Sequence, residues 1–306
     1  MPAARQFGPT AWLAISTYLA LWGGAVFYLK TTGGDWTTPL IVMGVFGVAC
    51  SAIAWALTIG ADAPRIEVKR PALESFAILI YLALYAVGFL GFGMGFARHA
   101  APPGQLQELL VMGLKLTVHV VLPALLLIVL GEKLGPLFQS GLKGRKFWRT
   151  FIVMGAIFLG LLSVISPSLK NIADTHTAAT TLIWAAPLSF VWIAVEAGLN
   201  EEFLFRAVLQ TRLTAWFNSP WAGVALTAIL FGLAHAPGLY LRGGPGVDGW
   251  SSDPLQVIAH TIATLSPMGV LFGLIYARTK SLLLVVLLHG MVDVLPNMAD
   301  FIRIWI

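Results

Sequence analysis

The sequence predicts an all-α protein, a polytopic transmembrane helical bundle with about eight or nine membrane helices. Hydrophobic residues make up 58% of the 306 residues and charged residues only 11%, against roughly 25% charged residues in a soluble globular domain. Long apolar runs recur along the whole chain, each near the roughly 20 residues that a helix needs to cross a bilayer. Alternating strand patterns are absent from the sequence, so helices must satisfy the backbone hydrogen bonds in the membrane.

Nine apolar runs predict the individual membrane helices, and several are short enough that one could be re-entrant. In chain order the runs are Ala11–Leu29, Leu40–Ile59, Phe76–Ala97, Leu109–Leu130, Phe151–Ile165, Leu182–Leu199, Trp221–Ala236, Val257–Ala277 and Leu282–Leu295. The largest loop that we assign to the cytoplasmic side, Glu132–Thr150, divides the chain into two parts. Residues 1–150 hold about four helices of unassigned role, and residues 151–306 hold nearly all of the remaining polar residues found within apolar runs.

The net charge of +5 is concentrated in particular loops. Two loops, "ADAPRIEVKRP" and Glu132–Thr150, are distinctly basic, and two helices separate them. They therefore lie on one side of the membrane, which the positive-inside rule makes cytoplasmic. Arg5 joins this side, so we expect a cytoplasmic N-terminus and a C-terminus on the opposite side. The positions of the charges follow membrane topology and indicate no nucleic-acid partner.

The first part of the chain has few ionisable residues within its apolar runs, and Lys115 and His119 are the exceptions. A charge within the membrane is by default a functional hypothesis. Lys115 is expected near a helix end, however, where its ammonium group could extend to the interface. We therefore favour a structural role for it.

The segment "EAGLNEEFLFR" places several charges in an otherwise apolar region. On a helix Glu202 and Arg206 stand at i and i+4, so they can pair along one face. Glu201 projects about 100° away from Glu202 and must face another partner. Glu196 could line the same cavity or cap an irregular stretch at Gly198. We predict that Glu202 and Arg206 are structural and that Glu201 faces a polar site.

Two later segments place histidines inside apolar helices. "FGLAH" ends in His235, and "HGMVD" puts His289 and Asp293 at i and i+4 on one face. If the helices on either side of "FNSP" are antiparallel, Glu201 and His235 lie at similar depth, about 25 Å from the turn. His289 and Asp293 come to about 14 and 20 Å by the same rise. We therefore expect these four side chains to converge on one hydrated site, because unpaired charge in the membrane is costly.

A carboxylate and two imidazoles in one cavity are suited to hydrolysis. A desolvated glutamate is a workable general base at neutral pH, and imidazoles can position a water or donate to a developing oxyanion. Nucleophile motifs offer no competing interpretation, because the sequence has no G-x-S-x-G, no Cys near a His and no H-E-x-x-H.

The three motifs together resemble those of the CPBP family of intramembrane proteases. "EEFLFR" is similar to E-E-x-x-x-R, "FGLAH" to F-x-x-x-H with Phe231 at its start, and "HGMVD" to H-x-x-x-[ND]. This family comprises the type II CAAX prenyl endopeptidases and the bacterial Abi proteins. The resemblance covers about Phe151–Asp293, makes residues 151–306 a CPBP-like catalytic core, and suggests a prokaryotic member.

The resemblance implies a role for each matching residue. Glu201 would activate a water with the help of His235, while His289 and residue 293 would form the oxyanion hole. Glu202, Arg206 and Phe231 would support this arrangement. The eukaryotic enzymes carry Asn at the last position, whereas this chain has Asp293. An ionised Asp cannot donate to an oxyanion, so it would have to be protonated or orient His289.

Two alternatives remain open from the sequence. Glu201, His235, His289 and Asp293 are also an acceptable zinc ligand set, although we expect no metal and no other cofactor. The same polar cluster could instead belong to a non-catalytic membrane scaffold or immunity protein, or to a transporter. The hydrolase interpretation predicts a multi-pass protein of the plasma (inner) membrane, if prokaryotic, with a peptide or membrane-protein substrate.

Overall fold

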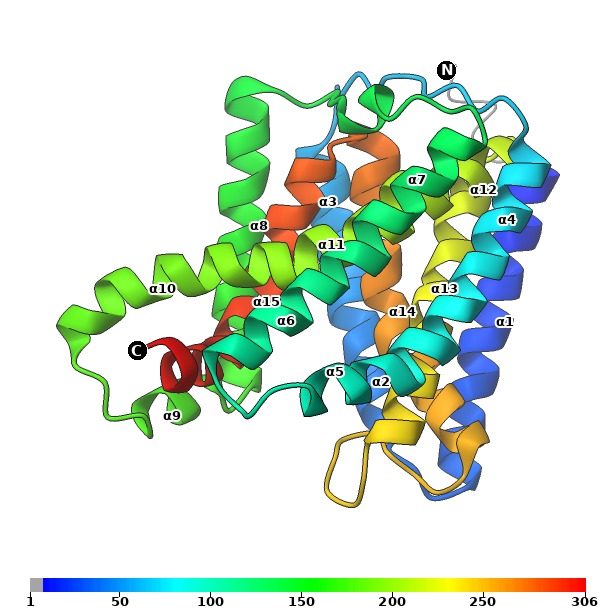
Figure 1. Ribbon diagram of the computed structural model, residues 1–306. Coiled ribbons are helices and arrows are strands. Elements are labelled where there is room, and N and C mark those ends of the chain that lie inside the picture. The colour runs from blue at the N-terminus through cyan, green and yellow to red at the C-terminus, as the bar shows by residue number, and fades with distance from the viewer. Residues whose placement is uncertain (1–7) are drawn as a thin grey trace.

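The computed structural model describes residues 8–306, and all regular secondary structure in that range is helical (Figure 1). The α-helices are α1 (Pro9–Thr31), α2 (Thr37–Val42), α3 (Ser51–Leu57), α4 (Pro71–Leu84), α5 (Met94–His99), α6 (Gln105–Leu116), α7 (Leu122–Val129), α8 (Gly144–Ile165), α9 (Ser168–Ala173), α10 (Ala179–Ile193), α11 (Asn200–Glu202), α12 (Thr211–Trp216), α13 (Pro220–Arg242), α14 (Pro254–Thr279) and α15 (Leu282–Trp305). The π-helical stretches are η2 (Met43–Cys50), η3 (Tyr85–Gly93), η4 (Thr117–Val121), η6 (Ala194–Leu199) and η7 (Phe203–Gln210), and η5 (Gly135–Phe138) is a 3₁₀ turn.

Within residues 8–306, nine helical segments are long and apolar enough to cross a membrane. They are Pro9–Thr31, Thr37–Leu57, Pro71–His99, Gln105–Val129, Gly144–Ile165, Ala179–Trp216, Pro220–Arg242, Pro254–Thr279 and Leu282–Trp305. Each overlaps one of the nine predicted runs, which confirms the polytopic helical bundle. Most segments extend beyond the predicted run because polar and charged residues continue the helix past its apolar part.

α14 lies at the centre of the bundle and packs against α1, α3 and α13. Small residues allow the close approach that packs helices in a membrane. A Cβ atom on Gly269 of α14 would lie 2.8 Å from the Cα of Ala228 in α13. Polar contacts add to this packing, since the indole of Trp22 in α1 donates to the carbonyl of Ala263 at 3.0 Å. The core is therefore held by backbone proximity as well as by apolar burial.

The two basic loops lie at the same end of the bundle, as predicted (Figure 1). The amide of Asp62 donates to the carbonyl of Gly141 at 3.1 Å, and the amide of Gly141 donates to the carbonyl of Thr279 at 2.7 Å. The loop between α13 and α14 lies at the opposite end (Figure 1). Arg5 falls outside the described residues, and the cytoplasmic assignment of the basic end stays a prediction.

The sixth segment, Ala179–Trp216, is longer than the predicted run Leu182–Leu199. Its 38 residues would extend about 57 Å at 1.5 Å per residue, nearly twice the thickness of a hydrocarbon core. The segment includes α10, η6, α11, η7 and α12, and α10 runs across α8 and α15 rather than along them (Figure 1). The charged motif therefore lies in the middle of this segment and not after its end.

The two parts of the chain pack closely against each other. Arg212 of α12 forms an ion pair with Glu74 of α4, with 3.4 Å between Nε and Oε2, and both side chains are buried. η4 and α4 also pack against η7. The division at residue 150 into an N-terminal part and a catalytic core stays a prediction.

Candidate active site

The charged motif lies where the sixth segment departs from regular α-helical geometry. α11 is a single short turn that carries Glu201 and Glu202, and the π-helical stretches η6 and η7 flank it. π-Helical turns in α-helices occur frequently at functional sites. Neighbouring residues on a helix point about 100° apart. Glu201 and Glu202 therefore face different surroundings, as the sequence predicts.

Glu202 is paired with Arg206 in the interior of the protein. The Oε2 atom of Glu202 accepts a hydrogen bond from the Nε of Arg206 at 2.9 Å, and both side chains are 0% exposed. The guanidinium group also lies over the ring of Phe231, 5.3 Å from its centroid. Its two Nη atoms have no hydrogen-bond partner among residues 8–306. The pair joins α11 to η7, and the guanidinium connects η7 to α13 through Phe231. The structural role of Glu202 and Arg206 stays a prediction.

His235 projects from α13 towards Glu201. Its Nδ1 lies 2.7 Å from the carbonyl oxygen of Phe231, which can only accept, so Nδ1 carries the proton and donates it. The other ring nitrogen, Nε2, lies 3.8 Å from the Oε1 of Glu201. The backbone of α13 thus orients the imidazole and leaves Nε2 facing the carboxylate.

His289 projects from α15 and lies near the carboxylates of Glu201, Glu202 and Asp293. Its Nδ1 lies 2.8 Å from the Oε1 of Glu202. Its Nε2 lies 3.2 Å from the Oδ2 of Asp293 and 3.8 Å from the Oε2 of Glu201. The ring stacks on Phe272 of α14, with an interplanar angle of 6° and centroids 5.1 Å apart. A hydrogen bond on one nitrogen and a stacked face together leave the ring a single orientation.

The structure brings together the four residues that the sequence predicts as catalytic. Each oxygen of the Glu201 carboxylate faces a different imidazole at 3.8 Å, which is longer than a direct hydrogen bond and leaves room for a bridging water. The Glu201 and His235 side chains remain 20% and 27% exposed, whereas Glu202 is fully buried. The buried carboxylate holds the site together and the accessible one faces its open part. The catalytic roles of these residues stay a prediction.

The hydrogen bond between Glu202 and His289 is a feature that the sequence analysis missed. It joins residues 87 positions apart on two helices, and it exists only because α15 is rotated to turn His289 towards α11. The i,i+4 spacing of Glu202 and Arg206 predicts a partner for one oxygen of the Glu202 carboxylate, but it gives no information about the partner of the other oxygen. A second partner could have been suspected only because a buried carboxylate has several acceptor sites to satisfy.

The N-terminal part also contributes polar groups near this site. Lys115 forms an ion pair with Glu196 of η6, and it lies in the middle of the segment Gln105–Val129. Lys115 does stand in the last turn of α6, but α6 continues into η4 and the ammonium group pairs with Glu196 within the bundle. The Nε2 of His119 lies 2.8 Å from the hydroxyl of Tyr85. The sequence did offer a signal for this ion pair. Glu196 is a second charge in an apolar region, and a charge there requires a partner of opposite sign.

No group of three or more His, Cys, Asp or Glu side chains in the described part of the chain is arranged so that it could hold a metal ion. The cluster of Glu201, His235, His289 and Asp293 is thus built from pairwise contacts between acids and imidazoles. Whether the site uses zinc stays a question for a metal-removal experiment.

One comparison with known proteins identifies this region. Residues 182–295 match the family model described as type II CAAX prenyl endopeptidase Rce1-like. The matched range contains all seven residues of the three motifs and ends shortly after Asp293. No curated protein and no solved structure matches the chain.

Proposed function

From the match of residues 182–295 to the Rce1-like type II CAAX prenyl endopeptidase model, we propose that the chain is an intramembrane endopeptidase in which Glu201 activates a water molecule. One observation carries the proposal. The two oxygens of the Glu201 carboxylate each face an imidazole nitrogen at 3.8 Å, inside a helical bundle. A water in this position can donate to Glu201 while it interacts with His235.

In the proposed reaction the water oxygen attacks the carbonyl carbon of the scissile peptide bond. Glu201 takes a proton from the water, and the electrons of the carbonyl double bond move to its oxygen. The intermediate then collapses as the carbonyl double bond re-forms, the C–N bond breaks, and the leaving amine takes up the proton that Glu201 received from the water. His235 is suited to assist, since its Nδ1 is engaged by the Phe231 carbonyl and its Nε2 faces the site.

His289 is suited to stabilise the oxyanion. Its Nδ1 proton is held by Glu202, so a proton on Nε2 makes the ring a cation with one N–H directed into the site. A charged donor held in place before the reaction stabilises developing negative charge most effectively. Asp293 lies 3.2 Å from this same Nε2. We assign Asp293 the role of orienting His289 rather than of donating to the oxyanion.

The decisive experiment compares wild-type protein with the Glu201→Gln variant. Purified protein in detergent is incubated with a peptide library, and the products are identified by mass spectrometry. Gln cannot accept the proton from water, so cleavage should fall by at least about a hundredfold, while membrane abundance stays unchanged. Glu108→Gln, at a position outside the cluster, should cleave like wild type.

Two outcomes would overturn parts of the proposal. If Glu201→Gln cleaves normally, the glutamate mechanism fails, and if wild-type protein cleaves nothing, the scaffold interpretation is favoured. Cleavage should also persist after stripping with a metal chelator. Loss of cleavage that zinc restores would assign the reaction to a metal.

A further inference from the structure

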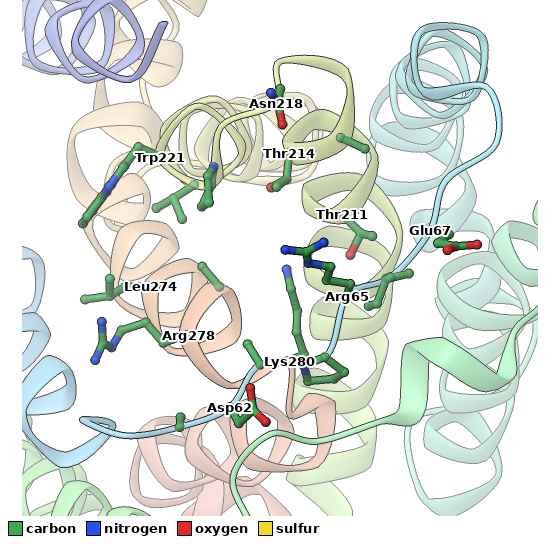
Figure 2. A pocket seen from close by; sticks show the side chains of 18 of the residues that line it. Asp62, Arg65, Glu67, Thr211, Thr214, Asn218, Trp221, Leu274, Arg278 and Lys280 are labelled. Carbon is green, nitrogen blue, oxygen red and sulfur yellow. The ribbon is translucent and has the colours of Figure 1, made fainter. Parts of the chain in front are cut away.

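A cavity with several charged residues in its walls lies at the end of the bundle that carries the two basic loops. Its volume is about 650 Å³, and none of the residues of the Glu201 cluster lines it. The walls come from α3, the loop before α4, α12, and the adjoining ends of α13 and α14 (Figure 2). The cavity is therefore distinct from the proposed active site and is reached from the predicted cytoplasmic interface.

Two cations extend into this cavity without a carboxylate partner. Figure 2 shows the side chains of Arg65 and Lys280 pointing into the same space. Neither forms an ion pair with a carboxylate of residues 8–306. Asp62 and Glu67 also line the cavity, and the carboxylate of Glu67 points away from it in Figure 2. Two like charges in one cavity repel each other unless an anion lies between them.

The third cation of the cavity, Arg278, is already engaged. Its Nε donates to the hydroxyl of Thr58 at 2.7 Å, and its guanidinium lies 3.8 Å from the centroid of the Trp55 ring. The Nζ of Lys280 lies 4.9 Å from the centroid of the Tyr276 ring. Within residues 8–306, Arg65 and Lys280 are thus the two of these three cations that have neither a hydrogen bond nor an ion pair from the side chain.

Lys280 has a backbone conformation that lysine rarely adopts. This residue ends α14 in the left-handed conformation, with φ at 51°, where glycine or asparagine is the favoured residue. Burial also lowers the pKa of the Lys280 ammonium group to about 8, so the charge lies in an environment that does not favour it. The chain therefore keeps a lysine where both backbone and solvation oppose one.

The remaining walls supply groups that an anionic head group can use. Thr211 and Thr214 also line the cavity, but their hydroxyl groups are buried, and that of Thr211 donates to the carbonyl of Arg206 at 3.2 Å. Trp55 and Trp221 stack along another wall with centroids 5.8 Å apart. Tryptophans concentrate at membrane interfaces, and basic pockets between helices on the cytoplasmic side bind lipid head groups.

We propose that this cavity binds a phosphate group, supplied by the head group of an anionic phospholipid, through Arg65 and Lys280. The guanidinium group provides a planar pair of donors and the ammonium group a point charge, which together match the oxygens of a phosphate diester. The bound anion removes the repulsion between the two cations.

The test measures thermal unfolding of the purified full chain in detergent by tryptophan fluorescence. Dioctanoyl phosphatidylglycerol, dioctanoyl phosphatidylcholine and inorganic phosphate are titrated at constant ionic strength. A ligand that binds only the folded state raises Tm in a saturable way. Phosphatidylglycerol should raise Tm and phosphatidylcholine should not. A response to inorganic phosphate as well would identify free phosphate as a second source for the same site.

Variants then assign the response to the two cations. Arg65→Gln and Lys280→Asn should each raise the lipid concentration for half-maximal effect by about tenfold or more. Lys280→Asn suits the left-handed backbone, so its Tm without lipid should be no lower than that of wild type. The control is the double variant Lys143→Gln and Arg145→Gln, two exposed basic residues outside the cavity, which should respond like wild type.

Three results would overturn the proposal. These are an equal response to both lipids, a wild-type response of Arg65→Gln and Lys280→Asn, or a loss of response in the control variant. The last would show that general surface charge, not this cavity, attracts the lipid. All three readouts are independent of peptide cleavage, so they separate this site from the proposed protease activity.

Discussion

Asp293 is the residue at which the proposed site differs most from an ordinary oxyanion hole. Its Oδ2 lies 3.2 Å from the Nε2 of His289, and its side chain remains 31% exposed. A carboxylate there can accept from the imidazole, but it cannot donate to a developing oxyanion. The contact therefore favours a positioning role that an amide oxygen could also fill.

Replacing Asp293 with Asn should preserve most of the activity, and Asp293→Ala should not. The Asn Oδ1 can still accept from His289, and its amide can donate to the oxyanion, whereas Ala does neither. In Asp293→Ala the His289 N–H is no longer held in place, and loss of one oriented donor in such a site costs about a hundredfold in kcat. Measuring kcat and KM for both variants checks this. Equal loss in the two variants would mean that the negative charge itself is required.

Glu201 and Glu202 are adjacent, yet replacing each with Gln should affect the stability of the protein differently. Glu202→Gln leaves Arg206 buried without its anion and weakens the bond to His289, so the free energy of unfolding should fall by about 3–5 kcal/mol. Glu201→Gln removes no contact shorter than 3.8 Å and should leave stability nearly unchanged. Urea or heat unfolding of the two variants in detergent distinguishes them. Equal stability would contradict the division into structural and reactive carboxylates.

The positions of the membrane helices could be predicted from the sequence, but the π-helical stretches within them could not. Nine apolar runs correspond to nine segments because the length needed to cross a bilayer leaves little choice. The π-helical stretches η6 and η7 could not be predicted, since the added residue per turn is stabilised by contacts with other helices. The sixth segment was predicted to end at Leu199 for the same reason: its charged continuation is helical only because partners bury it.

The crossing of η6 and α15 depends on a glycine. A Cβ atom on Gly198 would lie 2.5 Å from the backbone oxygen of Val286, too close for the two helices to keep their separation. Gly198→Ala should lower the free energy of unfolding by about 1–3 kcal/mol. It should also reduce cleavage, because Val286 lies one turn before His289. Gly160→Ala in α8, where a Cβ meets nothing within 4 Å, is the control and should be neutral or slightly stabilising. A neutral Gly198→Ala would contradict close packing at this crossing.

At the scale of the whole molecule, ion pairs connect the N-terminal helices to the matched region. Lys115 of α6 pairs with Glu196 of η6, and Glu74 of α4 pairs with Arg212 of α12. The family match begins at residue 182, so one partner of each pair lies outside it. The N-terminal helices therefore position the segment that carries the candidate site.

Lys115→Met should destabilise the protein more than the double variant Lys115→Met/Glu196→Gln. The single change leaves a carboxylate within the membrane region without its cation, at a cost of about 1–3 kcal/mol given that both side chains are 20% exposed. Neutralising Glu196 should recover most of that loss. A double-mutant cycle on unfolding free energies measures the coupling. Additive effects would show that the pair does not contribute.

The convergence of Glu201, His235, His289 and Asp293 was predicted because depth along a helix follows from residue count. The contact of Glu202 with His289 and the partners of Glu196 and His119 were not, because they depend on how each helix is rotated about its own axis. The sequence pattern determines how deep a residue lies in the membrane, but it does not determine which neighbouring helix its side chain faces. Contacts between residues 81 and 87 positions apart are set by that second coordinate.

A π-turn contains one residue more than the α-turn it replaces, and this gives the stretch Phe203–Gln210 a constraint on its length. Deleting a single residue there would still leave a continuous apolar helix. Unless the remaining residues reverted to α-helical geometry, everything on one side of the gap would swing about 100° relative to the other. The carboxylate of Glu202 and the guanidinium of Arg212 could then no longer both reach His289 and Glu74. Along this stretch, the fold should therefore tolerate the substitution of a side chain far better than the deletion of a residue.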